Sequence, residues 1–327
     1  MSEQKKKGFL YSLFNRDGKG VKPEDVVTTT GLKGFFYRYR LSFGKLLSIN
    51  IMYVLGNAML IFLIMTLAGY TKEAYTELEH GFFSMSQGIL TAKSETSAAD
   101  LALTSILGGQ SPAYANTAWT YVFWGLSALT LLTFGCVNVG TAYVLRNLCR
   151  GGEAVFPFSD FVYAVKRNYK QAIPMGIIDG LILMLLSYNI YTMILTTTNF
   201  WSSTMLWMNI AIFLIYFLMR FYIYVLMVTF DLTLGKIIKN SLIFTMLGIK
   251  RNLLALLGII FLLVVEYLIL MAGGPYLFPV AIGYPLLLLF SHAAFMAIYA
   301  SYFVIKKYMI DPLNLKDNSG QNKLTAE

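Results

Sequence analysis

Long apolar runs separated by shorter polar segments dominate the chain. A helix that crosses a bilayer needs about 20 mostly apolar residues. Six runs reach this length, at about 46–69, 118–145, 171–195, 205–230, 253–273 and 277–305. The last two are separated only by Gly273-Gly274-Pro275-Tyr276, where glycine and proline favour a tight turn between two helices. The pattern therefore predicts an all-α, polytopic domain over 46–305 with six transmembrane helices.

Polar segments precede, interrupt and follow these runs. Residues 1–45 form a lead whose last part, 32–45, mixes aromatic with basic residues. Such a mixture can stack on nucleic-acid bases, but its place directly before a span favours a juxtamembrane helix that lies on the lipid surface. The loop 70–117 contains a predicted amphipathic helix at 97–107, and residues 306–327 form a C-terminal tail.

The composition agrees with a membrane protein. Of the 327 residues, 57% are hydrophobic and 13% are charged, whereas an average soluble domain has roughly 25% charged residues. The chain nevertheless carries 26 Lys and Arg against 17 Asp and Glu, a net charge of +9. A soluble nucleic-acid-binding protein would be basic but less apolar. We therefore expect the positive charge to mark one side of the membrane, with no nucleic-acid partner.

The charges alternate from one segment between spans to the next. Residues 1–45 hold ten Lys and Arg against four acids, and the loops 146–170 and 231–252 are also basic. The loop 70–117 has a net charge of −3, and the short loop at 196–204 has no charge. By the positive-inside rule, this alternation places both termini in the cytoplasm.

The two inner loops resemble each other. Each ends in Lys-Arg-Asn, at 166–168 and 250–252, and the span after each soon contains Gly-Ile-Ile, at 176–178 and 258–260. A parallel repeat, in which helices 2 and 3 correspond to helices 4 and 5, would account for both features.

Signatures of soluble enzymes are absent from the sequence. It contains no GxGxxG, Walker A, GxSxG or HExxH motif, and its two histidines and two cysteines lack metal-ligand spacing. We therefore expect a protein that is not an enzyme, holds no metal and needs no cofactor. A membrane-embedded enzyme is the least favoured hypothesis, because no nucleophile–base pair is recognisable.

Four ionisable residues lie inside the predicted spans, where such groups are costly and usually face the interior of the bundle. They are Asp179, Arg220, Glu266 and His292. Their depths, counted from the inner ends of the spans, predict an Asp179–Arg220 pair and a deeper Glu266–His292 pair. Two interpretations stay open: pairing that fixes the register of the helices, or a polar path for a solute or a proton.

Gly176 and Gly180 form a GxxxG motif on the third span. Small residues at this spacing let another helix approach closely. We expect a packing role, which would help to bring Asp179 against Arg220.

The first inner loop contains a predicted amphipathic helix that begins at the N-cap Ser159, with an acid in its first turn and basic residues at its end. Its candidate contact residues are Phe158, Asp160, Phe161, Lys166, Arg167, Asn168 and Lys170. The plain interpretation is an interfacial helix held against lipid headgroups. The alternative is a docking element for a cytoplasmic subunit.

Several motifs resemble the YesL-like family of bacterial integral membrane proteins, a family with no established activity. They are Phe14-Asn15-Arg16-Asp17-Gly18, Asn138-Val139-Gly140-Thr141-Ala142-Tyr143, Arg150-Gly151-Gly152-Glu153, Phe158-Ser159-Asp160-Phe161, the run 166–172 and Asn240-Ser241-Leu242. The chain differs from the usual member in a longer first outer loop and a longer N-terminal lead. The resemblance implies a multi-pass protein of the bacterial cytoplasmic (inner) membrane that accompanies carbohydrate uptake.

The leading hypothesis is a non-enzymatic accessory or transport-related component of carbohydrate uptake. Its partners would be the lipid bilayer and a subunit of a carbohydrate ABC transporter. The alternative is direct transport of a small solute along a polar path through the membrane. The sequence assigns neither the substrate nor the oligomeric state.

Overall fold

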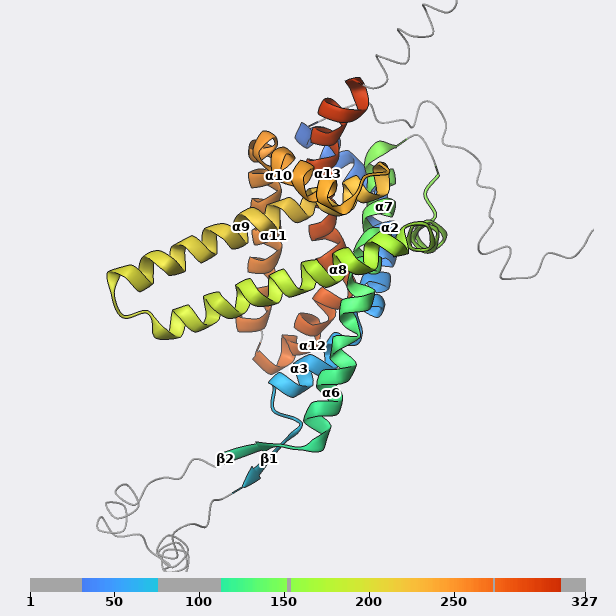
Figure 1. Ribbon diagram of the computed structural model, residues 1–327. Coiled ribbons are helices and arrows are strands. Elements are labelled where there is room, and N and C mark those ends of the chain that lie inside the picture. The colour runs from blue at the N-terminus through green and yellow to red at the C-terminus, as the bar shows by residue number, and fades with distance from the viewer. Residues whose placement is uncertain (1–30, 76–112, 152–153, 273, 313–327) are drawn as a thin grey trace, which may run out of the picture. The chain divides into compact units, whose positions relative to one another are not determined.

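The computed structural model describes residues 31–75, 113–151, 154–272 and 274–312 (Figure 1). The helix predicted at 97–107 lies outside these ranges, as do residues 1–30 of the lead and most of the tail. Two compact units divide the chain. One comprises Met1–Ala58 and Leu131–Glu327, and the other comprises Met59–Thr130.

Helices make up the described part of the larger unit. They are α2 (Gly31–Gly56), α7 (Thr130–Arg150), α8 (Pro157–Thr196), α9 (Phe200–Thr229), α10 (Leu234–Leu247), α11 (Ile249–Ala272), α12 (Gly274–Tyr284) and α13 (Phe290–Ile305), with the π-helical turns η2 (Pro285–Leu289) and η3 (Lys306–Ile310). Helix α9 packs against α8, α10 and α13, and α13 also packs against α2 and α11. Figure 1 shows α8 and α9 side by side as a long helical hairpin.

The smaller unit contains α3 (Leu60–Leu67), α6 (Ala118–Ala128) and two short strands. The strands β1 (Lys72–Tyr75) and β2 (Ala113–Asn116) pair in antiparallel register, with Lys72 opposite Asn116. At the end of this ladder, Thr120 donates a hydrogen bond to the carbonyl oxygen of Thr71 at 2.8 Å. The strands lie in the predicted outer loop 70–117, where the sequence pattern indicated none.

The predicted polytopic, all-α class is confirmed. Among the described residues, five helices are long and apolar enough to cross a membrane, or six if α2 and α3 together count as one span. The predicted first span differs in detail. Helix α2 joins the predicted juxtamembrane helix 32–45 to the start of the span and ends at Gly56, so that the apolar run 46–69 is helical in two pieces.

Helix α8 is one continuous helix of 40 residues, which corrects the prediction of a separate helix in the first inner loop. It begins two residues before the predicted N-cap, because Pro157 occupies the first helical turn, where its missing N–H costs nothing. The carboxylate of Asp160 accepts a hydrogen bond from the backbone N–H of Phe156 at 3.1 Å. The basic end of the loop is therefore rigidly continuous with the third span.

The last apolar run is also not one regular helix. Between α12 and α13 the backbone widens into the π-helical turn η2, which begins at Pro285. The buried side chain of Asn50 in α2 stabilises this turn. Its amide nitrogen donates to the carbonyl oxygens of Pro285 and Leu286 at 3.0 and 2.8 Å, and its oxygen accepts from the backbone N–H of Ser291 at 2.8 Å.

The buried core of the larger unit lies where α7, α9 and α13 meet α2 and α10. Its largest fully buried side chains include Tyr222, Phe295 and Leu145. By contrast, many apolar side chains of α8, α9 and α11 are exposed, among them Trp201 and Trp207 of α9. Exposed apolar residues of this size, on helices long enough to span a bilayer, are the surface that lipid tails cover.

Candidate functional site: a polar cavity among the membrane helices

Asp179 is the most completely satisfied ionisable residue inside the predicted spans. Its side chain on α8 is fully buried. Tyr216 donates to its Oδ1 at 2.9 Å, Tyr224 donates to its Oδ2 at 2.6 Å, and Nε of Arg220 lies 2.8 Å from Oδ1 and 3.1 Å from Oδ2. The predicted Asp179–Arg220 pair therefore exists, and two tyrosines extend it.

The three donors come from a single helix. Tyr216, Arg220 and Tyr224 follow one another at intervals of four residues on α9. Residues at this spacing lie on one face of a helix, about one turn apart. Among the described residues, a single stripe of α9 thus supplies every side-chain partner of the Asp179 carboxylate, and it holds α8 and α9 in one register.

Arg220 uses only one side of its guanidinium for this pair. Both contacts with Asp179 are made by Nε, and no described residue accepts a hydrogen bond from Nη1 or Nη2. The group lies 5.5 Å from the ring centre of Phe134, close enough for a cation–π contact. The edge of the guanidinium that carries both Nη atoms is therefore free to bind another group.

Glycines place α8 against α7. A Cβ atom on Gly176 would lie 2.3 Å from the backbone nitrogen of Gly135, and one on Gly135 would lie 1.8 Å from the carbonyl oxygen of Ala172. Gly180 also faces α7, where a Cβ would lie 2.7 Å from a side-chain methyl group of Leu131. The GxxxG motif has the expected packing role, but the helix that it admits is α7, and not α9 with its Arg220.

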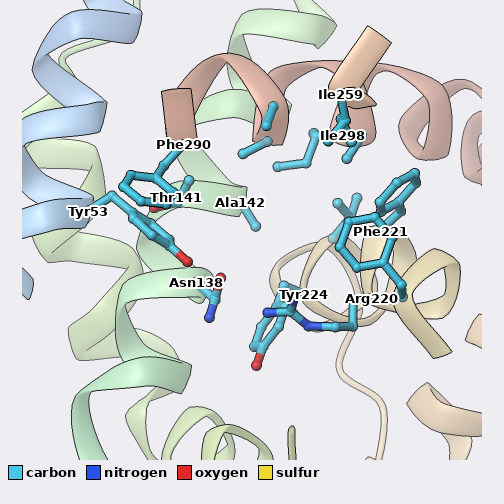
Figure 2. A pocket seen from close by; sticks show the side chains of 15 residues that line it. Tyr53, Asn138, Thr141, Ala142, Arg220, Phe221, Tyr224, Ile259, Phe290 and Ile298 are labelled. Carbon is cyan, nitrogen blue, oxygen red and sulfur yellow. The ribbon is translucent and has the colours of Figure 1, made fainter. Parts of the chain in front are cut away.

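A cavity of about 220 Å³ opens beside this pair. Residues of α2, α7, α9, α11 and α13 line it. Figure 2 shows the hydroxyl of Tyr53, the amide of Asn138 and the guanidinium of Arg220 along one part of the wall, with the apolar side chains of Ile259 and Ile298 elsewhere. The space is smaller than the roughly 300–1,000 Å³ of sites that bind drug-sized ligands.

Several polar atoms of the wall have hydrogen-bonding capacity left over. The hydroxyl oxygen of Thr141 is buried and has no hydrogen-bond partner among the described residues. Asn138 donates its amide nitrogen to the carbonyl oxygen of Phe134 at 2.8 Å, which leaves its side-chain oxygen to accept from a ligand. A buried polar atom without a partner is costly, and a solute or water bound in the cavity would supply a partner for Thr141.

The predicted Glu266–His292 pair is wrong. Among the described residues, one carboxylate oxygen of Glu266 and Nε2 of His292 have no hydrogen-bond partner. The other ring nitrogen of His292 contacts the carbonyl oxygen of Leu288, one turn earlier in the chain. The imidazole packs edge-on against Tyr39 and Phe43 of α2, with ring centres 5.4 Å apart in each case. Equal depth in the membrane did not bring the two residues to the same face.

The residues predicted for docking lie on the first turns of α8 and divide into two groups. Phe158, Lys166, Arg167 and Lys170 are exposed. Phe161 instead packs so closely on α7 that a Cβ on Gly140 would lie 2.6 Å from its ring, and Asn168 donates to the carbonyl oxygen of Ala164 in its own helix at 2.9 Å. The exposed group is basic with one aromatic residue.

Sequence reasoning missed most of the wall of the cavity. Tyr53, Asn138 and Thr141 are uncharged, and uncharged polar residues are common in membrane helices, so nothing marked them out. The tyrosines around Asp179 had a usable signal. Tyr216 and Tyr224 flank Arg220 at four residues on either side, so they share its face on an otherwise apolar helix.

Comparison with known proteins identifies one likeness. Residues 113–190 match the model of a family described as "Protein of unknown function, DUF624". This stretch contains β2, α6, α7 and most of α8, and therefore Asn138, Thr141 and Asp179, but not Arg220. No curated protein and no solved structure matches the chain.

Proposed function

We propose that this multi-span membrane protein binds a small polar solute in the cavity beside Asp179 and Arg220 and takes part in its passage across the membrane, without catalysing a reaction. One observation carries the proposal. A space among membrane helices is lined by the guanidinium of Arg220 and the hydroxyl of Thr141, and neither the two Nη atoms nor this hydroxyl has a hydrogen-bond partner within the part of the chain that the structure describes. A space filled by lipid, or one that serves only packing, does not need such donors. Polar groups in the membrane interior are costly unless they bind a partner.

The same arrangement also serves structure, but structure alone does not account for it. The pairing of Asp179 with Arg220 and two tyrosines fixes α8 against α9. That role is complete with Nε of Arg220 alone, and it requires neither the free edge of the guanidinium nor the polar atoms of α2 and α7. The remaining donors and acceptors converge on the space, as in a site for a small ligand.

Thiol accessibility tests this proposal. Ala294 lines the cavity, whereas Ala300 on the same helix is buried and does not. In a background with both native cysteines, Cys136 and Cys149, replaced by alanine, we expect Ala294→Cys in membrane vesicles to react with a small water-soluble thiol reagent. Ala300→Cys should react at least about tenfold more slowly, because water does not reach it.

Reagent applied from each side of the membrane gives further information. Reaction of Ala294→Cys from both sides, under different conditions, would support passage of the solute. Reaction from one side only would support binding without passage. Equal, slow reaction of Ala294→Cys and Ala300→Cys would mean that water does not enter the cavity, and would contradict the proposal.

An accessory role in carbohydrate uptake in the bacterial inner membrane is the second candidate. The resemblance to the YesL-like family supports it, and so does the exposed basic end of α8, where Lys166, Arg167 and Lys170 project beside Tyr163 and Tyr169. Because α8 is continuous, a subunit bound at this end would contact a rigid extension of the helix that carries Asp179. Lipid headgroups could occupy the same surface.

Site-specific crosslinking distinguishes the two occupants. A photocrosslinking residue at Tyr163 should recover a subunit of an ABC transporter at native abundance. The matched control is Tyr191, an exposed tyrosine near the other end of α8, which should recover no such subunit. Recovery of lipid alone at Tyr163 would assign the basic end to the membrane surface and count against the accessory role.

A further inference from the structure

We propose that the solute in this cavity is a small hydroxylated monocarboxylate, held by the Nη edge of Arg220 and by the hydroxyl of Thr141. This inference rests on the proposed function, because it names the chemical class of the solute for that site. It is drawn from the shape and charge of the cavity wall.

The guanidinium is presented in the geometry that suits a carboxylate. Arginine binds planar oxyanions through two parallel N–H···O bonds from one edge. Here Nε is committed to Asp179, at 2.8 Å from Oδ1, and the group is further fixed over Phe134. The edge that remains has both Nη atoms, and Arg220 is among the residues that line the space. The orientation of the guanidinium is thus set before a ligand arrives, which lowers the entropy cost of binding.

The charges around the cavity favour a single negative charge on the ligand. Of the described residues that line the wall, Arg220 is the only charged one, while its partner Asp179 is fully buried and does not line the space. The tyrosine hydroxyls of α9 further stabilise the charge of that carboxylate by donating to both of its oxygens. A solute in the cavity therefore meets one positive group and no negative one. One cation suits a monoanion better than a doubly charged phosphate ester.

The uncharged polar atoms of the wall favour hydroxyl groups on the same ligand. The Thr141 hydroxyl has no partner among the described residues and can donate or accept. The side-chain oxygen of Asn138 can only accept, since its amide nitrogen is bonded to Phe134. No described residue is hydrogen-bonded to the hydroxyl of Tyr53, which points into the same space (Figure 2). An aliphatic carboxylate without hydroxyls would leave these atoms unsatisfied.

Matched pairs of ligands test the inference with the purified full-length protein in lipid nanodiscs. Glycerate is compared with glycerol, and glucuronate with glucose, by isothermal titration calorimetry. Within each pair only the charge and shape of one terminal group differ. We expect the carboxylate of at least one pair to bind roughly tenfold or more tightly than its neutral partner, the effect of a charge-assisted hydrogen-bonded contact.

Variants assign that preference to Arg220. Arg220→Gln alone would leave Asp179 buried and unpaired, so the double variant D179N/R220Q is used, and its folding is checked by gel filtration and thermal unfolding. It should lose the preference for the carboxylate. The matched control Arg167→Gln removes an equal charge from the exposed start of α8 and should keep it. Arg220→Lys retains the charge without the planar edge, and should weaken carboxylate binding roughly tenfold.

The hydroxyl part of the inference has its own measurement. Propionate, which lacks hydroxyls, should bind more weakly than glycerate to the native protein. In Thr141→Val the difference between propionate and glycerate should shrink several-fold. An unchanged difference would remove Thr141 from the site.

Failure of this inference is distinguishable from failure of the proposed function. If Ala294→Cys reacts and neutral solutes bind as tightly as carboxylates, the cavity binds solutes but the monocarboxylate class is wrong. The same conclusion follows if D179N/R220Q keeps the preference. If Ala294→Cys does not react and no ligand of either pair binds, the proposed function fails together with it.

Discussion

Asn50 and Asp179 are both buried polar residues, and each makes several hydrogen bonds. Asn50 makes three hydrogen bonds with the backbone around η2. Asp179 accepts from three side chains of α9. A buried polar group left without a hydrogen bond destabilises a protein by more than a typical hydrogen bond stabilises it. Removal of either side chain should therefore cost more stability than the loss of its packing contacts alone.

Asn50→Ala should lower the free energy of unfolding by about 2–5 kcal/mol, because it removes the side-chain partner of two carbonyl groups in η2 and of the N–H of Ser291 at the start of α13. Thermal or denaturant unfolding in detergent measures the change. Asn209→Ala is the control, since its amide nitrogen donates to the carbonyl oxygen of Met205 in its own helix and to the weakly accepting sulfur of Met193 on α8, and it should cost less than about 1 kcal/mol. Equal effects of the two substitutions would show that η2 does not depend on Asn50.

Tyr224→Phe should lower the free energy of unfolding by about 1.5–3 kcal/mol, the usual range for a hydrogen bond to a charged group. Its hydroxyl is 2.6 Å from Oδ2 of Asp179. Tyr188→Phe, on the exposed face of α8, changes the same atom away from this cluster and should be neutral within about 0.5 kcal/mol. A neutral Tyr224→Phe would mean that Tyr216 and Nε of Arg220 together satisfy the carboxylate without the third donor.

At the scale of the helices, close backbone contact positions α7 against α8. Gly135 and Gly176 meet through backbone atoms, so that neither position has room for a methyl group. The sequence motif Gly176–Gly180 predicted such a crossing, but it did not identify the partner, because a small-residue stripe states only that some helix comes close. Gly135 makes an equally close contact but gives no such signal in the sequence, because it has no second glycine four residues away.

Gly176→Ala should destabilise the protein by about 1–3 kcal/mol through overpacking. A Cβ at Gly44 of α2 would meet nothing within 4 Å. The control Gly44→Ala should therefore be neutral or stabilising by up to about 1 kcal/mol, since alanine favours a helix more than glycine does. Unfolding in detergent compares the two variants, and a stable Gly176→Ala protein would mean that α7 and α8 can separate without loss.

At the same scale, helix boundaries were harder to predict than helices. Hydropathy located the apolar runs, since a bilayer imposes their length. It could not show that α2 and α8 extend well beyond the apolar part, because polar residues continue a helix as readily as they end it. The wide turn η2 also left no clear signal, since its stabilising partner Asn50 is more than 230 residues away in the sequence.

At the scale of the whole molecule, the fold class and one ion pair of the polar interior could be predicted from the sequence. The apolar runs predicted a multi-span helical protein, and burial cost led to the pairing of Asp179 with Arg220. The pairing of Glu266 with His292 failed because depth along two helices says nothing about which faces meet. The cavity wall required the folded arrangement, since it joins uncharged residues from α2, α7 and α9.

The distribution of charge predicts that both termini lie in the cytoplasm. A fluorescent protein fused after Glu327 should therefore fluoresce, and alkaline phosphatase fused there should be inactive. A fusion after Thr198, in the uncharged loop between α8 and α9, should give the opposite pair of results. Active phosphatase at the C-terminus would reverse the orientation and place the basic end of α8 outside the cytoplasm.

The fixed pairing of Arg220 with Asp179 has a consequence for energy supply. Because Arg220, the one charged group among the described residues of the wall, is already balanced by a carboxylate bound to its Nε, the pair adds no net charge of its own to a bound solute. The membrane potential would then act on the charge of the solute alone, at about 2.3 kcal/mol per elementary charge for each 100 mV. Uptake of an anion into a cell with a negative interior would be uphill by that amount, so inward movement would need coupling to an ion gradient or to ATP hydrolysis by another protein.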